Sequence, residues 1–155
     1  MKPRLLCFLL AAAIMALVPA CVSTDNGTAR EPNWPLIETT ARSSVKWATK
    51  LVLDKNPGYA DSAAAVSAAV ATVFAGVPTA ESVQGHLVAI LPNLTPADAA
   101  ILAAAFMDAY GAYVAATGRT ELISTDIHVE ALVAAITSGI ADGVMLHRAT
   151  QPIRP

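Results

Sequence analysis

The sequence predicts an all-α protein, a compact bundle of about five helices behind a signal peptide and a flexible tether. Apolar residues recur at steps of three and four positions in five stretches, which is the period of an amphipathic helix. Prolines and glycines separate those stretches, and alanine, the best helix former, is frequent within them. We expect residues 1–20 to be the signal peptide, 21–35 the tether and 36–150 the helical domain.

The N-terminus has the layout of an export signal. Lys2 and Arg4 precede an apolar run over residues 5–17. This run is too short to cross a bilayer comfortably, because a spanning helix needs roughly 20 apolar residues. We therefore expect the segment to be cleaved after export rather than to remain as a membrane helix.

The expected cleavage region reads Leu17-Val18-Pro19-Ala20-Cys21. It resembles the lipobox of bacterial lipoproteins, although Pro19 is an unusual occupant of its position. The resemblance implies a diacylglyceryl group on the Cys21 thiol and acylation of the freed amine, and two or more acyl chains hold a protein stably on a membrane. Because Val22 rather than Asp follows the cysteine, the resemblance also favours the outer membrane of a Gram-negative host. An ordinary secreted protein with a chance cysteine is the alternative.

Charge and cysteine content exclude some classes of protein. Without Lys2 and Arg4, eight Lys and Arg remain against twelve Asp and Glu, which argues against nucleic-acid binding. Cys21 is the only cysteine left after cleavage, so no intramolecular disulfide can form. Residues 56–118 contain no Lys or Arg, and we expect them to bury their apolar faces in a core, a partner or a membrane.

The first helix is expected over residues 36–55, ended by Pro57 and Gly58. At helical spacing, Arg42, Lys46 and Lys50 form a basic ridge. We interpret the ridge as a solvated face, with attraction to anionic headgroups beneath the anchor as the alternative.

Trp34 lies just before the first helix. We expect this side chain to pack on the edge of the domain. Its insertion into the headgroup layer, where tryptophan is enriched, is the second interpretation.

Two shorter helices follow. The first is expected over residues 59–75, is rich in alanine and ends at Gly76. The second is expected over residues 79–91, with Thr79 as its cap and Pro92 after its end.

The strongest local signal is Thr95-Pro96-Ala97-Asp98, which combines a hydroxyl cap, a proline in the first turn and an acid at the third position. It predicts a helix that runs to Thr117 and stops at Gly118. Because Asp108 lies near its middle, we expect a buried core helix rather than a membrane span.

The last helix is expected from a cap among residues 124–126 to about Arg148. Gly139 and Gly143 have the spacing that lets two helices touch. We interpret them as a tight contact within the chain, with self-association as the alternative.

We find no convincing catalytic, metal or cofactor motif. His86, His128 and His147 lack a zinc spacing. Asp108 and Asp142 are the one acid pair that could face each other across two helices, and we expect each to lie on a solvated face instead. We therefore expect no enzyme activity, cofactor or metal.

Residues 45–57 (VKWATKLVLDKNP) look like the opening helix of small all-helical proteins of phages and prophages. Residues 94–98 are similar to their mid-chain cap. This resemblance supplies a genetic context but no mechanism, because those proteins lack an assigned activity.

These observations favour a lipid-anchored lipoprotein of the cell envelope that acts as a structural or interaction module. We expect an envelope protein as its partner and a phage-derived accessory role, such as blocking a receptor or excluding a later infection. A membrane-active protein, whose alanine-rich helices insert or oligomerise during lysis or permeabilisation, is the alternative.

Overall fold

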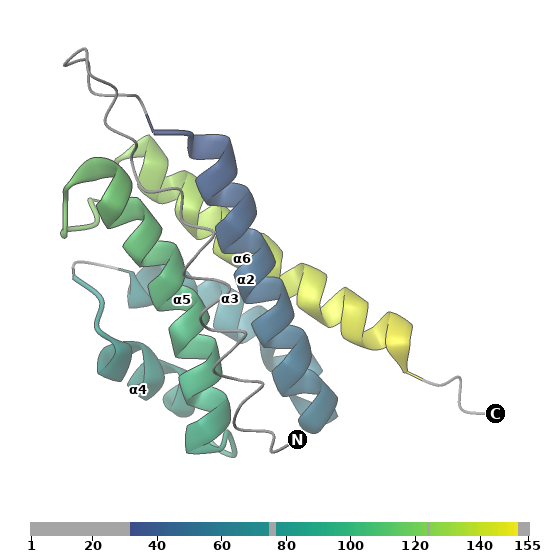
Figure 1. The fold of residues 1–155 in the computed structure, drawn as a ribbon. Coiled ribbons are helices and arrows are strands. Elements are labelled where there is room, and N and C mark those ends of the chain that lie inside the picture. The colour runs from purple at the N-terminus through teal and green to yellow at the C-terminus, as the bar shows by residue number, and fades with distance from the viewer. Residues whose placement is uncertain (1–31, 75–76, 124, 152–155) are drawn as a thin grey trace, which may run out of the picture. The chain divides into compact units, whose positions relative to one another are not determined.

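The computed structural model describes residues 32–74, 77–123 and 125–151. In these ranges the chain forms five α-helices and one 3₁₀ helix, and no strand, so the predicted all-α bundle is confirmed (Figure 1). In chain order the elements are α2 (Trp34–Lys55), η1 (Pro57–Ser62), α3 (Ala63–Val73), α4 (Ala80–Ile90), α5 (Pro96–Thr117) and α6 (Ile127–Thr150). The predicted signal peptide, Cys21 and Gly76 lie outside the described residues.

Helix α5 runs antiparallel to α2 (Figure 1). The ring of Trp34, at the start of α2, lies 6.3 Å from that of Tyr113 near the end of α5. At the opposite end, Lys55 Nζ lies 3.1 Å from Asp98 Oδ1 in the first turn of α5. These two contacts fix the direction of the pair.

Helix α6 runs parallel to α2, and these two helices make the most extensive contacts in the domain. Trp34 stacks on His128 at the start of both helices. Near their ends, Asp54 Oδ1 lies 2.9 Å from His147 Nδ1. The first and last helices of the domain are therefore joined along their length, although about 70 residues separate them in the sequence.

The short helices complete the core, with α3 packed on α6 and α4 on α5. Each of the five helices contributes at least one side chain that is almost inaccessible to solvent. The largest of these side chains are Tyr113, Phe106, Leu87, Ile136, Val45, Val70 and Val83. Because all five helices share this one cluster, the described residues form a single hydrophobic core.

The first helix begins at Trp34, two residues before the predicted start. Asn33 is the cap, and its side chain accepts a hydrogen bond from the Leu36 amide at 3.2 Å. Pro35 is tolerated because the first-turn amides of a helix have no partner within the helix.

The predicted helix over residues 59–75 is partly wrong, because Pro57–Ser62 forms the 3₁₀ helix η1 and α3 begins only at Ala63. The Tyr59 amide donates to the Asn56 carbonyl at 3.1 Å, which closes the tighter turn. Ser62 gives α3 no side-chain cap. Alanine content predicted a helix here, but the hydrogen bonds after Pro57 decide where it begins.

The other helix boundaries agree with the predictions to within two residues. Thr79 and Thr95 cap α4 and α5, and Gly118 ends α5 with a left-handed φ of 68°. Asp126 caps α6 by accepting from the His128 amide at 2.9 Å. Helix α6 ends at Thr150, slightly beyond the predicted Arg148.

Candidate functional site

Gly139 and Gly143 on α6 lie directly against the backbone of α2. A Cβ atom on Gly139 would lie 2.6 Å from the Arg42 carbonyl oxygen. One on Gly143 would lie 2.6 Å from Thr49 Cβ and 2.7 Å from the Lys46 carbonyl oxygen. Neither position has space for a side chain, so the interpretation of these glycines as a contact within the chain is confirmed.

Arg42 and Asp142 form an ion pair beside the glycine contact. The guanidinium donates to the two carboxylate oxygens at 2.6 and 3.1 Å. This two-point hydrogen bonding lowers the pKa of Asp142, against a smaller opposing effect of burial. Lys50 is also paired, with Asp54. Two of the three cations of the predicted ridge therefore bind carboxylates of this chain, although Arg42 remains 53% exposed.

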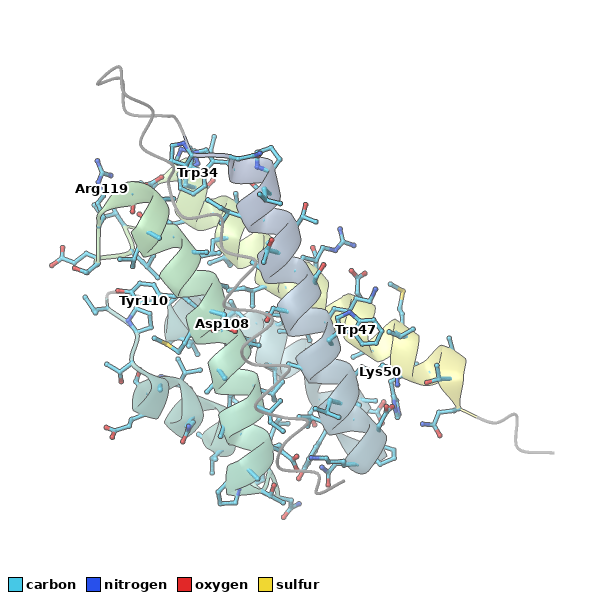
Figure 2. All side chains as sticks on the ribbon, in the orientation of Figure 1. Trp34, Trp47, Lys50, Asp108, Tyr110 and Arg119 are labelled. Carbon is cyan, nitrogen blue, oxygen red and sulfur yellow. The ribbon has the colours of Figure 1, made fainter. Side chains whose placement is uncertain are left out.

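The structure does not bring Asp108 and Asp142 together as an acid pair. Both oxygens of Asp142 are held by Arg42. Asp108 lies midway along α5 (Figure 2), and partial burial is the only cause that raises the pKa of its carboxyl group. It makes no hydrogen bond to any described residue. The alternative that these acids cooperate in acid–base chemistry is therefore wrong.

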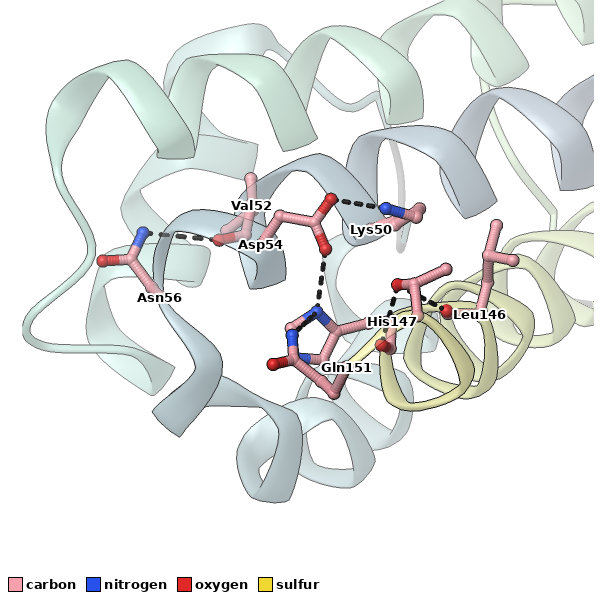
Figure 3. A network of polar contacts seen from close by, with 8 residues as sticks. Lys50, Val52, Asp54, Asn56, Leu146, His147 and Gln151 are labelled. Atoms are coloured by element: carbon pink, nitrogen blue, oxygen red, sulfur yellow. Dashed lines mark hydrogen bonds and ion pairs between the residues drawn. The ribbon is translucent and has the colours of Figure 1, made fainter. Parts of the chain in front are cut away.

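A polar network joins the C-terminal ends of α2 and α6 (Figure 3). His147 is only 3% exposed, and its Nδ1 lies 2.9 Å from Asp54 Oδ1. Lys50 binds the other Asp54 oxygen, and Gln151 lies beside the imidazole ring. The hydrogen bonds from Lys50 and then from His147 lower the pKa of Asp54.

Sequence reasoning missed this Asp54–His147 pair, because 93 positions separate the two residues. Only the pairing of α2 with α6 brings them together. A carboxylate that orients an imidazole is one part of a hydrolytic site. Within the described ranges, however, no hydroxyl or thiol contacts the ring, and the Nε2 neighbour is the Gln151 amide at 3.3 Å. The geometry is that of a contact holding two helices together.

A second cluster links the end of α2 to the start of α5. Asp98 is 3% exposed and accepts hydrogen bonds from Thr95, Lys55 and Asn56 at 2.8, 3.1 and 3.0 Å. Burial alone would raise the pKa of Asp98, but these hydrogen bonds hold it below its usual value. The residue predicted only as a cap acid thus also fixes the position of the neighbouring helix.

The remaining histidines have local partners. His86 Nδ1 lies 2.7 Å from the Ser82 carbonyl oxygen within α4. His128 stacks on Trp34 with ring centroids 3.6 Å apart and planes 9° from parallel. The expected packing of Trp34 on the domain is therefore confirmed. In the ranges that the structure covers, no three His, Cys, Asp or Glu residues are grouped to hold a metal ion.

Large apolar side chains are exposed on one side of the bundle. Trp47 and Leu51 on α2 are 58% and 47% exposed, and Met145 on α6 is 61% exposed. Lys46 and Lys50 lie among them, with Lys46 Nζ 5.4 Å from the Trp47 ring centroid. We call these five residues the side surface. Figure 2 shows Trp47 and Lys50 where α2 adjoins the C-terminal half of α6.

A shallow groove of about 350 Å³ adjoins the side surface. Its lining combines apolar and charged groups from both helices: Lys46, Asp142, Met145, Leu146 and Ala149. The groove is open to solvent and has no enclosed apolar floor, unlike a small-molecule pocket.

A second exposed apolar group lies in the turn between α5 and α6. Ile127 is 72% exposed and Ile123 is 50% exposed, and we call these two residues the end surface. The Asp126 amide donates to the Ile123 carbonyl at 2.8 Å, which keeps the two isoleucines in one turn. Acidic residues accompany them, including Glu121 and Glu130.

The core contains a cavity of about 30 Å³ where α2, α3 and α5 meet. Thr49 lines this cavity, and its hydroxyl has no hydrogen-bond partner among the described residues. The other lining side chains are almost wholly apolar. Such a volume is close to that of one water molecule and is too small for an organic ligand.

Helices α5 and α6 are long and apolar enough to cross a membrane, judged by length and composition alone. Such helices are also common in the cores of soluble proteins, so this property is weak support for a membrane span. No protein-family model matches the chain, and the searches of curated proteins and of solved structures find no match either.

Proposed function

We propose that this chain is a lipid-anchored lipoprotein of the bacterial cell envelope whose helical domain acts by contact with a partner rather than by catalysis. The export-signal layout and the lipobox-like run before Cys21 support the anchor. Packing of the five helices around one core supports a domain that folds beside the membrane. The proposed location is the outer membrane, with the domain in the periplasm or at the cell surface.

The observation that carries the contact role is the exposure of Ile127 in the end surface. This residue is 72% exposed, the highest value among the large apolar side chains of the described residues, and Ile123 of the same surface is 50% exposed. Exposed apolar side chains gathered in one place, with a polar rim, are typical of protein-binding surfaces. We propose an envelope protein as the occupant of this surface. A phage-derived accessory that blocks a receptor is the specific role that fits such a module.

Mass spectrometry of the protein purified from membranes tests the anchor. The expected mass is that of residues 21–155 plus a diacylglyceryl group and an additional acyl chain. Cys21→Ser should remove the lipid mass and release the protein from the membrane fraction. An unmodified chain, or one that retains residues 1–20, would disprove the anchor.

Site-specific photocrosslinking tests the contact role. A photoreactive residue in place of Ile127 should give one protein adduct in intact cells. The control is the same residue in place of Glu81, which is exposed on α4 and distant in sequence from the end surface. Absence of any protein adduct at Ile127 and at Ile123 would argue against the interaction module.

The second candidate is a membrane-active protein of lysis or permeabilisation, and the length of α5 and α6 favours it. Production of residues 22–155 in the cytoplasm separates the two candidates. A soluble helical monomer is expected for the interaction module. Partition into the detergent phase would instead support insertion of these helices into the membrane.

A further inference from the structure

We propose that the side surface rests on the bilayer to which Cys21 is attached, so that α2 lies along the membrane. This inference depends on the proposed lipid anchor and names a second contact of the same domain. The occupant is the headgroup layer of a bilayer that carries anionic lipid. The end surface then remains available to the protein partner.

The chemistry of the side surface matches a membrane interface. Tryptophan is enriched at the headgroup level, where its ring is half in water and half in hydrocarbon. Trp47 is the largest exposed side chain of the domain, and Leu51 follows it one helical turn later. Lys46 can extend its amine to the phosphates while its methylene groups cover apolar surface, and Lys50 lies nearby but binds Asp54. This combination of residues is typical of helices that lie in the interface.

The exposed apolar residues of α2 form a line along the helix. Leu36, Trp47 and Leu51 are each more than 45% exposed. Their spacings of eleven and four residues correspond to nearly whole turns, so the three side chains face one direction. At ~1.5 Å per residue the line extends for roughly 22 Å. Contact along such a line requires α2 to lie parallel to the membrane plane.

Because Cys21 tethers the domain to the membrane, the side surface can hold α2 on the bilayer although its own affinity for lipid is low. Residues 22–33 separate Cys21 from the start of α2. Twelve residues extend over roughly 40 Å at most, which keeps the domain close to its own bilayer. A tethered group has an effective concentration on the order of millimolar. Three apolar side chains and Lys46 can therefore hold α2 on the membrane, although they would not recruit a free protein.

The charged residues near the two surfaces favour the side surface over the end surface as the membrane contact. Lys46 forms no ion pair with a described residue, and its nearest aromatic neighbour is Trp47. The end surface is instead accompanied by three acids, Glu121, Asp126 and Glu130, against one cation, Arg119, which pairs with Asp126. Basic residues near an anionic bilayer are attracted to it, whereas acidic residues are repelled. The end surface is therefore the poorer match for anionic headgroups.

A second copy of the chain fits the side surface less well than a bilayer does. A stable interface between proteins buries about 800 Å² on each partner. The side surface offers three exposed apolar side chains beside an open groove. Self-association through this surface would give a fluorescence signal that depends on protein concentration and not on lipid.

The chain has two tryptophans, which gives the experiment a matched control. The lipidated protein is purified from membranes and reconstituted in phosphatidylglycerol-containing vesicles with brominated acyl chains. In the variant Trp34→Phe, Trp47 is the only emitter, and we expect its fluorescence to fall at least twofold relative to unbrominated vesicles. In the variant Trp47→Phe, the emitter is Trp34, which stacks on His128, and we expect little quenching.

Equal quenching of the two variants, or none in Trp34→Phe, would overturn the inference. If Trp34→Phe does not fold, Leu51→Cys labelled with an environment-sensitive dye replaces it, with a blue shift on vesicles as the expected result. A dye or Trp47 signal that depends on protein concentration and not on lipid would show a second copy on this surface, which also overturns it. Mass spectrometry on the same sample distinguishes the two proposals, because a lipidated chain without quenching disproves only the membrane contact.

Discussion

Gly143 is one of two positions at which α6 lies directly against α2, and substitution there tests the packing of the pair. In Gly143→Ala the new methyl group would lie 2.6 Å from Thr49 Cβ. We expect a loss of about 1–3 kcal/mol in the free energy of unfolding, because the helices must separate. Urea denaturation of the purified protein measures this change.

Gly111→Ala provides the control for this prediction. Gly111 lies within α5, and nothing lies within 4 Å of the position of a new Cβ atom. Alanine should stabilise the helix here by roughly 0.5–1 kcal/mol through its higher helix propensity. Equal effects of the two substitutions would mean that the α2–α6 contact is looser than the structure indicates.

The carboxylates of Asp54, Asp98 and Asp142 predict the response to acid. The folded protein lowers the pKa of each of them. Their stabilising contribution is therefore complete above the unfolded value of about 3.9 and is lost as the pH falls below it. We expect the urea midpoint to drop between pH 5 and pH 3, and less steeply in Asp142→Asn. Burial raises the pKa of Asp108 in the folded protein, so the contribution of this residue to stability increases as the pH falls.

At the scale of the helix, Thr95 determines where α5 begins. Its hydroxyl accepts from the Asp98 amide at 3.2 Å and donates to the Asp98 carboxylate at 2.8 Å. Thr95→Ala should reduce the free energy of unfolding by about 1–2 kcal/mol, because both bonds are lost. Thr95→Ser keeps the hydroxyl and should cost much less. Thermal unfolding followed by circular dichroism compares the variants, and equal losses in both would show that the cap is unimportant.

The ends of helices could be predicted where they depend on residues that lie close by in the sequence. The caps at Thr79 and Thr95 and the stop at Gly118 depend on residues within one turn, and the sequence contains them. The start of α3 could not be predicted in this way, since the hydrogen bonds after Pro57 favour a 3₁₀ turn despite the alanines that follow.

Contacts between helices could be predicted much less well. The pairs Arg42–Asp142 and Asp54–His147 join positions about 100 residues apart, and no spacing rule connects them. The two tryptophans show the same limit. Trp34 packs on the domain as expected and stacks on His128, whereas the exposure of Trp47 could not be predicted from the sequence. Which aromatic residue is buried depends on the position of α6, which local sequence does not determine.

At the scale of the whole molecule, the contacts of α6 predict that the domain unfolds as one unit. Helix α2 makes its most extensive contacts with α6, and α3 also packs on α6. A chain that ends after residue 125 would expose Val45 and the other residues that α6 covers. We expect this truncated chain to lose cooperative unfolding and to bind a hydrophobic dye. A sharp thermal transition in the truncated chain would contradict the shared core.

The parallel pairing of the first and last helices also has a consequence for biogenesis. Among the described helices, α2 is synthesised first and α6 last. The helix that makes the most extensive contacts with α2 is therefore absent until synthesis is nearly finished. For the exported protein proposed above, this order would keep the nascent chain open during synthesis, which suits passage through a translocation channel that admits only unfolded chains.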